Sequence, residues 1–279
     1  MARIIGLLYG VASYAVFFLT FLYSIAFVGN FEPLTLGATT ITFRTLDGPG
    51  ADAPFAAMAL IVNLVLLSVF AIQHSVMARP GFKKMWTKIV PKSVERSTYV
   101  LLSSGALILM FAYWQPITDS VWSTSGTVAT VLNGLFWAGW ATVLLSTFMI
   151  NHFDLFGLKQ VWDNMKQNEA TGRTRFVTKG LYRICRHPIM LGFLIAFWAT
   201  PTMTMGHLVF SVMTTGYILV ALIFEEKDLR TEFGETYARY QKGVSQLIPL
   251  KFGYRDDVAT SAVVDSSMVE EETKETTNI

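Results

Sequence analysis

The sequence predicts an all-α fold: a polytopic helical membrane protein with four full spans, a C-terminal helical hairpin and a cytosolic amphipathic helix. Three observations lead to this prediction. Of the 279 residues, 52% are hydrophobic and 15% are charged, whereas an ordinary soluble domain is about a quarter charged. The apolar residues form runs near the roughly 20 residues that a helix needs to cross a bilayer. The basic residues gather in alternate connecting segments.

The first four apolar runs predict complete spans, at about 4–28, 54–77, 97–114 and 127–150. The first follows Arg3 and has no clear small-residue cleavage site, so we expect a retained span and not a signal peptide.

The last two apolar runs predict a tight helical hairpin. The run 189–200 is only about a dozen residues long and meets Pro201, and proline lacks a backbone donor and ends or kinks a helix. The run 205–224 is long enough to span.

A stripe of large residues after the hairpin predicts the amphipathic helix. It consists of Leu229, Phe233, Tyr237, Tyr240 and Val244. We interpret it as a surface that packs over the membrane face and not as a cofactor box. From about residue 256 the chain turns acidic and rich in Ser and Thr, which predicts a disordered tail over 256–279. Residues 1–255 then form one membrane-embedded domain.

The distribution of charge predicts the orientation in the membrane. Apart from Arg3 and Arg44, the 22 Lys and Arg residues lie at 79–96, at 159–186 and after 225. Lys and Arg accumulate in cytosolic loops, so we expect the N-terminus, both basic loops and the C-terminus in the cytosol. The single cysteine, Cys185, excludes an intramolecular disulfide. No metal-type Cys/His spacing occurs, and neither a metal nor a nucleic acid is predicted as a partner.

An anion site is predicted where the fifth run begins. Pro188 fits the first turn of a helix, whose free N–H groups and dipole favour an anion. Arg186 and His187 add further donors. Glu225 and Glu226 close the sixth run, and the hairpin should return them to the same place. Acids at a helix C-terminus need a compensating cation, so the two ends together suit a zwitterionic amino acid. The alternative is that these charges pair with one another and with lipid phosphates.

Two sequence blocks carry a family resemblance in the C-terminal part. The first is Arg186-His187-Pro188 followed by Gly192. The second is Glu225-Glu226-Lys227-Asp228-Leu229, followed by Phe233-Gly234, Tyr237, Tyr240 and Leu247-Ile248-Pro249. Together they resemble the isoprenylcysteine carboxyl methyltransferase and phospholipid methyltransferase superfamily. Met190 stands where that superfamily usually has tyrosine.

Three blocks in the front half narrow the resemblance. Gln73–Pro80, Glu95–Tyr99 and Asn151–Leu158 are similar to bacterial methanethiol S-methyltransferases, which make dimethyl sulfide and are distantly related to NnrU-type membrane proteins. The resemblance implies a bacterial inner-membrane methyltransferase that converts methanethiol to dimethyl sulfide. Its cofactor would be S-adenosylmethionine, bound at the cytosolic face by Tyr182, Arg186, His187, Pro188, Glu225 and Glu226.

Polar residues at the membrane edge are the candidates for handling the thiol. A thiol is mostly protonated near neutral pH, since its pKa is about 8.5 in cysteine, so some group should take its proton. We expect His74 or His152 to do so, with Asp154 beside them as a further catalytic candidate. The expected substrate contacts are Gln73, Ser75, Arg79, Glu95, Arg96, Ser97 and Tyr99. Structural alternatives exist for each: Ser97 suits a helix cap, and Arg79 suits a contact with lipid phosphates.

Other functions remain open at this level. The same scaffold serves a prenylcysteine carboxylate or a phospholipid amine as acceptor. A transporter would place ionisable residues near mid-membrane and show repeats, and neither is evident. A membrane reductase would use a nicotinamide cofactor, but no Gly-rich dinucleotide motif follows a strand. Cys185 lies next to Arg186, which would lower a thiol pKa, but we interpret it as a packing residue. The oligomeric state is not predicted.

Overall fold

Five helices are long and apolar enough to cross a membrane, which confirms the predicted all-α, polytopic membrane fold. The structure is a computed structural model that describes residues 1–37, 39–49, 55–167, 173–176, 178–251 and 263–265. The five helices are α1 (Ala2–Val28), α2 (Ala56–Ala78), α4 (Glu95–Tyr113), α5 (Gly126–Ile150) and α9 (Met205–Gly243).

Shorter helices connect the long ones. They are α3 (Pro80–Trp86), α6 (His152–Leu155), α7 (Leu158–Lys166), the 3-10 helix η1 (Gly180–Arg183) and α8 (Pro188–Trp198). Helix α8 has 11 residues, so at 1.5 Å per residue it is about 16 Å long, too short to cross the bilayer core. It pairs with α9 as the short arm of the predicted hairpin.

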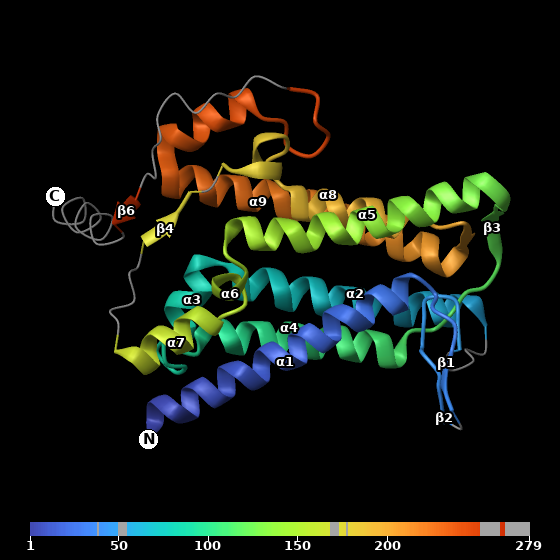
Figure 1. Ribbon diagram of the computed structural model, residues 1–279, viewed down its shortest axis with the longest axis horizontal. Coiled ribbons are helices and arrows are strands. Elements are labelled where there is room, and N and C mark those ends of the chain that lie inside the picture. Colours follow the sequence, from blue (N-terminus) through green and yellow to red (C-terminus); the bar gives the residue numbers. More distant parts are fainter. Residues whose placement is uncertain (38, 50–54, 168–172, 177, 252–262, 266–279) are drawn as a thin grey trace.

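The helices run side by side, so the bundle has two ends (Figure 1). We call one the basic end: it carries the N-terminus, α3, α6, α7 and the start of α8. The opposite end carries the strands β1, β2, β3 and β5. Basic connecting segments therefore gather at one end, which is the alternation predicted from the charges.

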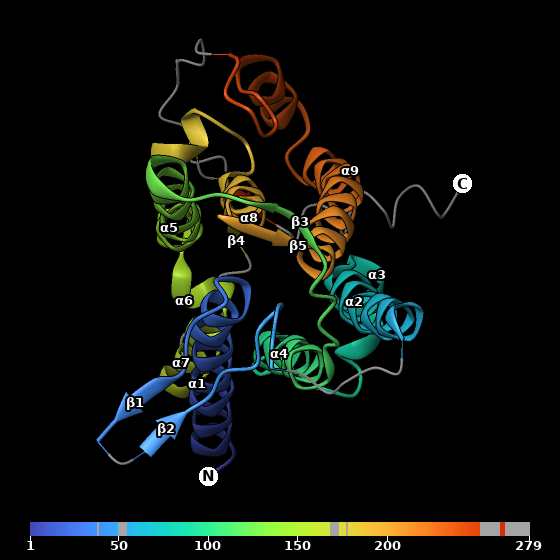
Figure 2. The same cartoon turned by 90° about the vertical axis from the view of Figure 1, so that its right-hand side faces the viewer.

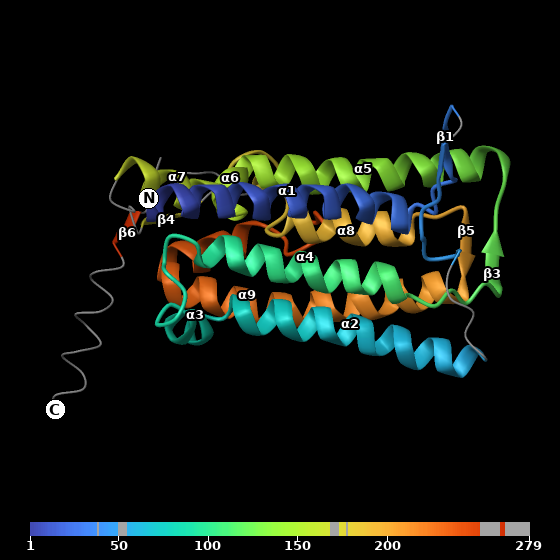
Figure 3. The same ribbon diagram turned by 90° about the horizontal axis from the view of Figure 1, so that it is seen from below.

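Seen end-on, the helices follow one another around the bundle in the order α1, α4, α2, α9, α8 and α5 (Figure 2), and Figure 3 shows them along its length. Successive helices from α1 to α5 pack against each other. Helices α1 and α5 close the circle through Phe21 and Trp140, whose ring centroids lie 5.5 Å apart at 82°.

Small residues allow α5 and α8 to pack backbone against backbone. A Cβ on Gly139 would lie 2.7 Å from the carbonyl oxygen of Gly192 and 2.7 Å from the backbone nitrogen of Ala196. Gly192 is the glycine of the sequence block that begins at Arg186, so the structure gives that block a packing role as well.

An aromatic core fills the opposite half of the bundle. Phe27, Trp114, Trp140 and Phe210 are buried in one cluster, together with Leu46 from the loop after β2. The indole N–H of Trp114 donates to the Leu46 carbonyl over 3.1 Å. This loop thus closes the opposite end with apolar packing.

A carboxylate fastens the same loop to its neighbours. The Asp47 carboxylate accepts a hydrogen bond from the Asn30 amide at 2.6 Å and another from the Thr204 hydroxyl at 2.5 Å. Burial raises the pKa of Asp47 above its ordinary value. The contacts join the end of α1 to the start of α9.

Helix α9 is longer than the sequence predicted. Glu225 and Glu226 were expected to close it at residue 226, but the helix continues to Gly243. The chain bends at Gly234, whose φ of 51° and ψ of −128° are not helical, a conformation that glycine adopts readily. The predicted amphipathic helix is therefore the continuation of α9 beyond this bend, and the two acids lie within the helix, away from its C-terminal dipole.

The short strands form three antiparallel pairs. They are β1 (Leu34–Leu36) with β2 (Thr39–Ile41), β3 (Ser120–Ser123) with β5 (Thr202–Thr204), and β4 (Arg173–Arg175) with β6 (Val263–Asp265). The predicted tail 256–279 lies outside the described residues except for β6.

Candidate functional site

An ion pair joins the start of α8 to α9 at the basic end. The Arg186 guanidinium contacts one oxygen of Glu226 through Nε at 2.7 Å and through Nη2 at 2.6 Å. Its Nη1 donates to the carbonyls of Gln241 at 3.2 Å and Val244 at 2.5 Å. The hairpin therefore does return Glu226 to Arg186, and most of the guanidinium's donors are used within the protein.

His187 extends this cluster. Its Nε2 lies 3.1 Å from the same Glu226 oxygen, and its Nδ1 lies 3.7 Å from a Glu225 oxygen. The His187 side chain is 5% exposed and that of Glu225 is 43% exposed. Glu226 also accepts from the Gln241 amide at 3.1 Å. We call Arg186, His187, Glu225, Glu226 and Gln241 the Arg186 cluster.

The segment beyond the bend of α9 covers this cluster. The backbone N–H groups of Arg186 and His187 donate to the carbonyls of Ser245 and Gln246 at 2.9 and 3.2 Å. Pro188 is the first residue of α8, as predicted. Two regions far apart in sequence, 185–188 and 241–246, are thereby held together at the start of α8.

Tyr182 and Cys185 are buried beside the Arg186 cluster, in the chain that leads to the start of α8. The Tyr182 carbonyl accepts from the Tyr240 hydroxyl at 2.5 Å, and the Tyr182 ring is buried. Burial raises the pKa of the Tyr182 hydroxyl. Burial also raises the pKa of the Cys185 thiol, and the nearby Arg186 offsets this only in part. Burial therefore outweighs the neighbouring arginine at Cys185, which is only 2% exposed.

A second polar group lies between α2 and α4. The Tyr99 hydroxyl is 3.0 Å from Nε2 of His74, and the Ser103 hydroxyl is 3.3 Å from Nδ1. Phe70 stacks on the imidazole with ring centroids 5.2 Å apart. We call His74, Tyr99 and Ser103 the His74 cluster. The sequence placed His74 and Tyr99 among the site residues, and the structure brings them into contact.

Two contacts between α2 and α9 set the two clusters at a similar depth. The Ser75 hydroxyl donates to the Tyr217 hydroxyl over 3.2 Å, and Arg79 pairs with Asp228 over 2.9 Å. Glu225 lies between Tyr217 and Asp228 on α9. From Tyr217 to Glu225 is two helical turns, about 12 Å. Ser75 follows His74 directly, so both clusters occupy the basic third of the bundle.

Three predicted substrate contacts open α4, and the chain between α5 and α7 holds two of them, Arg96 and Ser97. Arg96 lies over the Tyr99 ring at 5.1 Å and donates from Nε to the Leu155 carbonyl at 2.8 Å. Ser97 is fully buried and its hydroxyl is 3.5 Å from the Gly157 carbonyl. Glu95 is the first residue of α4 and is 8% exposed. Of these three, Arg96 touches the His74 cluster, through the ring of Tyr99.

His152 lies apart from both clusters, between α1 and α5. Its Nε2 is 2.8 Å from the Tyr14 hydroxyl and its Nδ1 is 2.9 Å from the Thr147 hydroxyl. Phe148 stacks on the ring at 4.3 Å, and burial lowers the pKa of His152. With both nitrogens engaged, His152 fastens two helices together.

Asp154 lies near the surface beyond His152. Its side chain is 47% exposed and its nearest cation is Lys159, at 3.9 Å. It is therefore not brought to His74 or to the Arg186 cluster. Within the described residues, no three His, Cys, Asp or Glu side chains converge in a way that could hold a metal ion.

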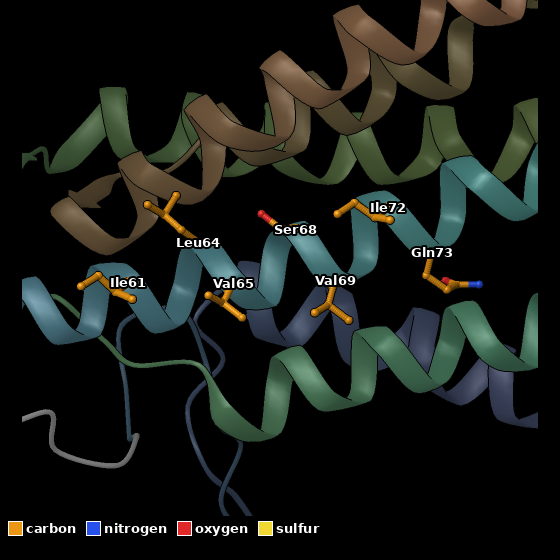
Figure 4. A pocket seen from close by; sticks show the side chains of 7 residues that line it. All are labelled: Ile61, Leu64, Val65, Ser68, Val69, Ile72 and Gln73. Atoms are coloured by element: carbon orange, nitrogen blue, oxygen red, sulfur yellow. The ribbon is translucent and has the colours of Figure 1, made fainter.

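An open apolar groove of about 570 Å³ follows the outer face of α2 (Figure 4). Its lining runs from Ile61 to Gln73, and the exposed side chains include Ile61, Val65 and Ile72. A surface of this kind on a spanning helix suits lipid chains. Gln73 ends the groove, and its amide donates to the Met77 sulfur at 3.1 Å.

Comparison with known proteins identifies the family. The family model described as "NnrU protein" matches residues 62–251. A relative named Methanethiol S-methyltransferase 2, from Bradyrhizobium diazoefficiens, is 50% identical over 91% of this chain and 93% of its own. The chain belongs to the NnrU family.

Other similar proteins carry the same kind of name. Methanethiol S-methyltransferase from Mycobacterium tuberculosis is 52% identical over 89% of this chain and 98% of its own. The protein of that name from Pseudomonas deceptionensis is 48% identical over 89% of this chain and 90% of its own. No solved structure matches this NnrU-family protein.

Sequence reasoning missed two groups at the site of this NnrU-family chain. Tyr217 is a polar residue in an apolar run, eight residues before Glu225, and that spacing places both on one side of a helix. The sequence spacing could therefore have identified Tyr217 as a candidate site residue. No sequence pattern could have identified Gln241, because its contact with Glu226 depends on the bend at Gly234.

Proposed function

We propose that this protein transfers a methyl group from S-adenosylmethionine to methanethiol, giving dimethyl sulfide, and that its basic end faces the cytosol. The observation that carries the proposal is the similarity, near 50% identity over about nine tenths of the chain, to proteins named methanethiol S-methyltransferase. The geometry adds two polar clusters at one depth of the bundle, which suits one site for the donor and one for the thiol.

The residues of the Arg186 cluster fit the amino-acid head group of the donor. Arg186 is neutralised by Glu226, so the remaining groups at this corner are His187 and the partly exposed Glu225. Glu225 would hold the ammonium group or a ribose hydroxyl. His187 and the N-terminus of α8 would hold the carboxylate, because helix N-termini favour anions. Tyr182 would lie toward the adenosine.

S-adenosylmethionine supplies, when bound, a methyl group on a cationic sulfur. A lone pair of the thiol sulfur would form the new S–C bond while the donor's methyl–sulfur bond breaks, and the electrons of that bond would leave with S-adenosylhomocysteine. The thiol proton would pass to a base, and the S–H electrons would stay on sulfur. We propose His74 as the proton acceptor, because Tyr99 and Ser103 orient its ring and no ion pair occupies it. His152 is not favoured, since it lies between α1 and α5, apart from both polar clusters.

The orientation follows from charge. The basic end holds the loops that are rich in Lys and Arg, and such loops stay in the cytosol. In a bacterium the protein would then lie in the inner membrane, with both termini and the two clusters on the cytosolic side. Methanethiol and membrane lipids would be its partners.

A direct test is dimethyl sulfide formation. The purified protein in detergent receives S-adenosylmethionine and methanethiol, and headspace gas chromatography measures the product. We expect turnover by the parent, a loss of about 10²-fold or more in kcat for His74→Gln, and a weaker dependence on His74 as rising pH ionises the thiol itself.

Matched variants control for folding. Tyr99→Phe should lower kcat, while Tyr113→Phe, exposed on the same helix, should not. Glu225→Gln should raise the KM for S-adenosylmethionine, while Glu235→Gln, exposed on the same helix, should leave it unchanged. Binding of S-adenosylmethionine without product from methanethiol would show that the acceptor is a different molecule. A folded protein that does not bind S-adenosylmethionine would refute the proposal.

A further inference from the structure

Tyr237 and Tyr240 lie one turn apart on the final segment of α9 and differ in the hydrogen bonding of their hydroxyl groups. Tyr237 and Tyr240 are 1% and 2% exposed, and both rings pack against Phe176 at 5.9 and 5.1 Å between centroids. The Tyr240 hydroxyl donates to the Tyr182 carbonyl. The Tyr237 hydroxyl is buried and makes no hydrogen bond of normal geometry among the described residues.

An unpaired hydroxyl is costly in this position. Leaving a buried polar group unsatisfied costs about 1–3 kcal/mol, whereas phenylalanine would make the same ring contacts without that cost. Packing against Phe176 and Phe233 therefore accounts for an aromatic ring at residue 237 but not for its hydroxyl. Among the described residues the oxygen has only the nearby Arg186 guanidinium, and the two do not form a hydrogen bond of normal geometry.

The position of the hydroxyl indicates what that partner is. It lies beside Arg186 and in the electrostatic field of Glu226 and Glu225. Arg186 and Glu226 are bonded to each other, to Gln241 and to backbone carbonyls. A ligand at this corner would therefore meet a neutralised ion pair together with His187 and a buried hydroxyl that lacks a hydrogen bond of normal geometry.

We infer that the Tyr237 hydroxyl is a binding group for the amino-acid head of the methyl donor, which it contacts beside the Arg186–Glu226 pair. This rests on the proposed function. It also adds to the interpretation of the stripe from Leu229 to Val244. The stripe packs over the bundle, and one of its members, Tyr237, would also direct its hydroxyl toward the bound methyl donor. The bend at Gly234 directs the segment back to the start of α8.

The test compares Tyr237→Phe with Tyr240→Phe, using thermal unfolding without ligand and calorimetric titration with two probes. The probes are S-adenosylmethionine and 5′-methylthioadenosine, which lacks the amino-acid head. For Tyr237→Phe we expect an unchanged or raised Tm without ligand. We also expect roughly tenfold weaker binding of S-adenosylmethionine, with binding of 5′-methylthioadenosine unchanged.

Tyr240→Phe should behave in the opposite way. It removes a hydrogen bond that exists without ligand, so its Tm should fall, while its affinity for S-adenosylmethionine stays within about twofold of the parent. The inference is overturned if Tyr237→Phe lowers the Tm and leaves the affinity for S-adenosylmethionine unchanged, or weakens both probes equally. If the parent binds neither probe, the proposed function itself fails, which is a distinct outcome.

Discussion

At the scale of single residues, most polar groups at the basic end hold helices together. Arg186 with Glu226 joins α8 to α9, Arg79 with Asp228 joins α2 to α9, and His152 joins α1 to α5. Such pairs leave few groups available to a ligand. The proposals for chemistry and binding therefore rest on three groups: His74, which lies between α2 and α4 and forms no ion pair among the described residues, the partly exposed Glu225, and Tyr237, whose hydroxyl lacks a normal hydrogen bond.

The contacts of His152 predict a pH-dependent contribution to stability. Burial lowers its pKa in the folded protein below the ordinary value of about 6.5. Above pH 6.5 the ring is neutral in both states and its two hydrogen bonds contribute fully. As the pH falls below 6.5 the unfolded chain takes up a proton first, so the folded state loses stability until the folded pKa is reached.

Thermal unfolding in detergent checks this. At pH 7.5, His152→Gln should be less stable than the parent by about 1–2 kcal/mol, the value of one or two hydrogen bonds. At pH 5.5 the difference should be smaller. A difference that grows as the pH falls would show that the ring is protonated when folded, contrary to this account.

At the scale of elements, the α5–α8 contact determines where the start of α8 lies. The two helices meet at Gly139 and Gly192 with their backbones in contact, and close approach of this kind is typical of helix pairs in membranes. Any side chain there would push α8 outward and carry Arg186 and His187 with it. The glycines therefore matter to the site without touching it.

Gly139→Ala tests this contact. Its new methyl group would meet the α8 backbone at 2.7 Å, so we expect a loss of about 1–3 kcal/mol, as for other overpacked interiors. Gly134→Ala is the matched control on the same helix, because a Cβ there meets nothing within 4 Å and alanine favours the helix. Thermal unfolding of the two variants measures the difference. If Gly139→Ala is as stable as Gly134→Ala, α5 and α8 can move apart at little cost.

At the scale of the whole molecule, the bundle is asymmetric from end to end. The opposite end is filled by an aromatic core and closed by the loop that contains Leu46. The basic end holds both polar clusters and the bend of α9. This arrangement suits a site that is reached from the basic end, and from the charge distribution we propose that this end faces the cytosol.

Single cysteines at the two ends test the orientation. Lys92→Cys lies in an exposed segment of the basic end and Ser125→Cys in an exposed segment of the opposite end. The natural Cys185 is buried, so it should give little background. A membrane-impermeant maleimide should label Ser125→Cys in intact cells but Lys92→Cys only after lysis. The reverse pattern would invert the proposed orientation.

Much of this protein follows from sequence alone. Composition and run length predict the number and place of the spans, because a bilayer demands about 20 apolar residues from any helix that crosses it. Charge patterning predicts which connecting segments share an end. The blocks around Arg186 and Glu225 predict a meeting point between the two arms of the hairpin, since a short connection returns the chain to the same depth.

Only the tertiary structure decided how the polar groups are used. The sequence ended the last helix at Glu226, because hydropathy marks where a helix leaves the apolar core and not where it ends. It treated His74 and His152 alike, since a hydrogen bond from Tyr14 to residue 152 joins positions far apart in the chain. Tyr237 and Tyr240 belong to the same stripe in the sequence. Only the packing of the segment beyond Gly234 against the start of α8 places one hydroxyl on the Tyr182 carbonyl and the other beside the Arg186–Glu226 pair.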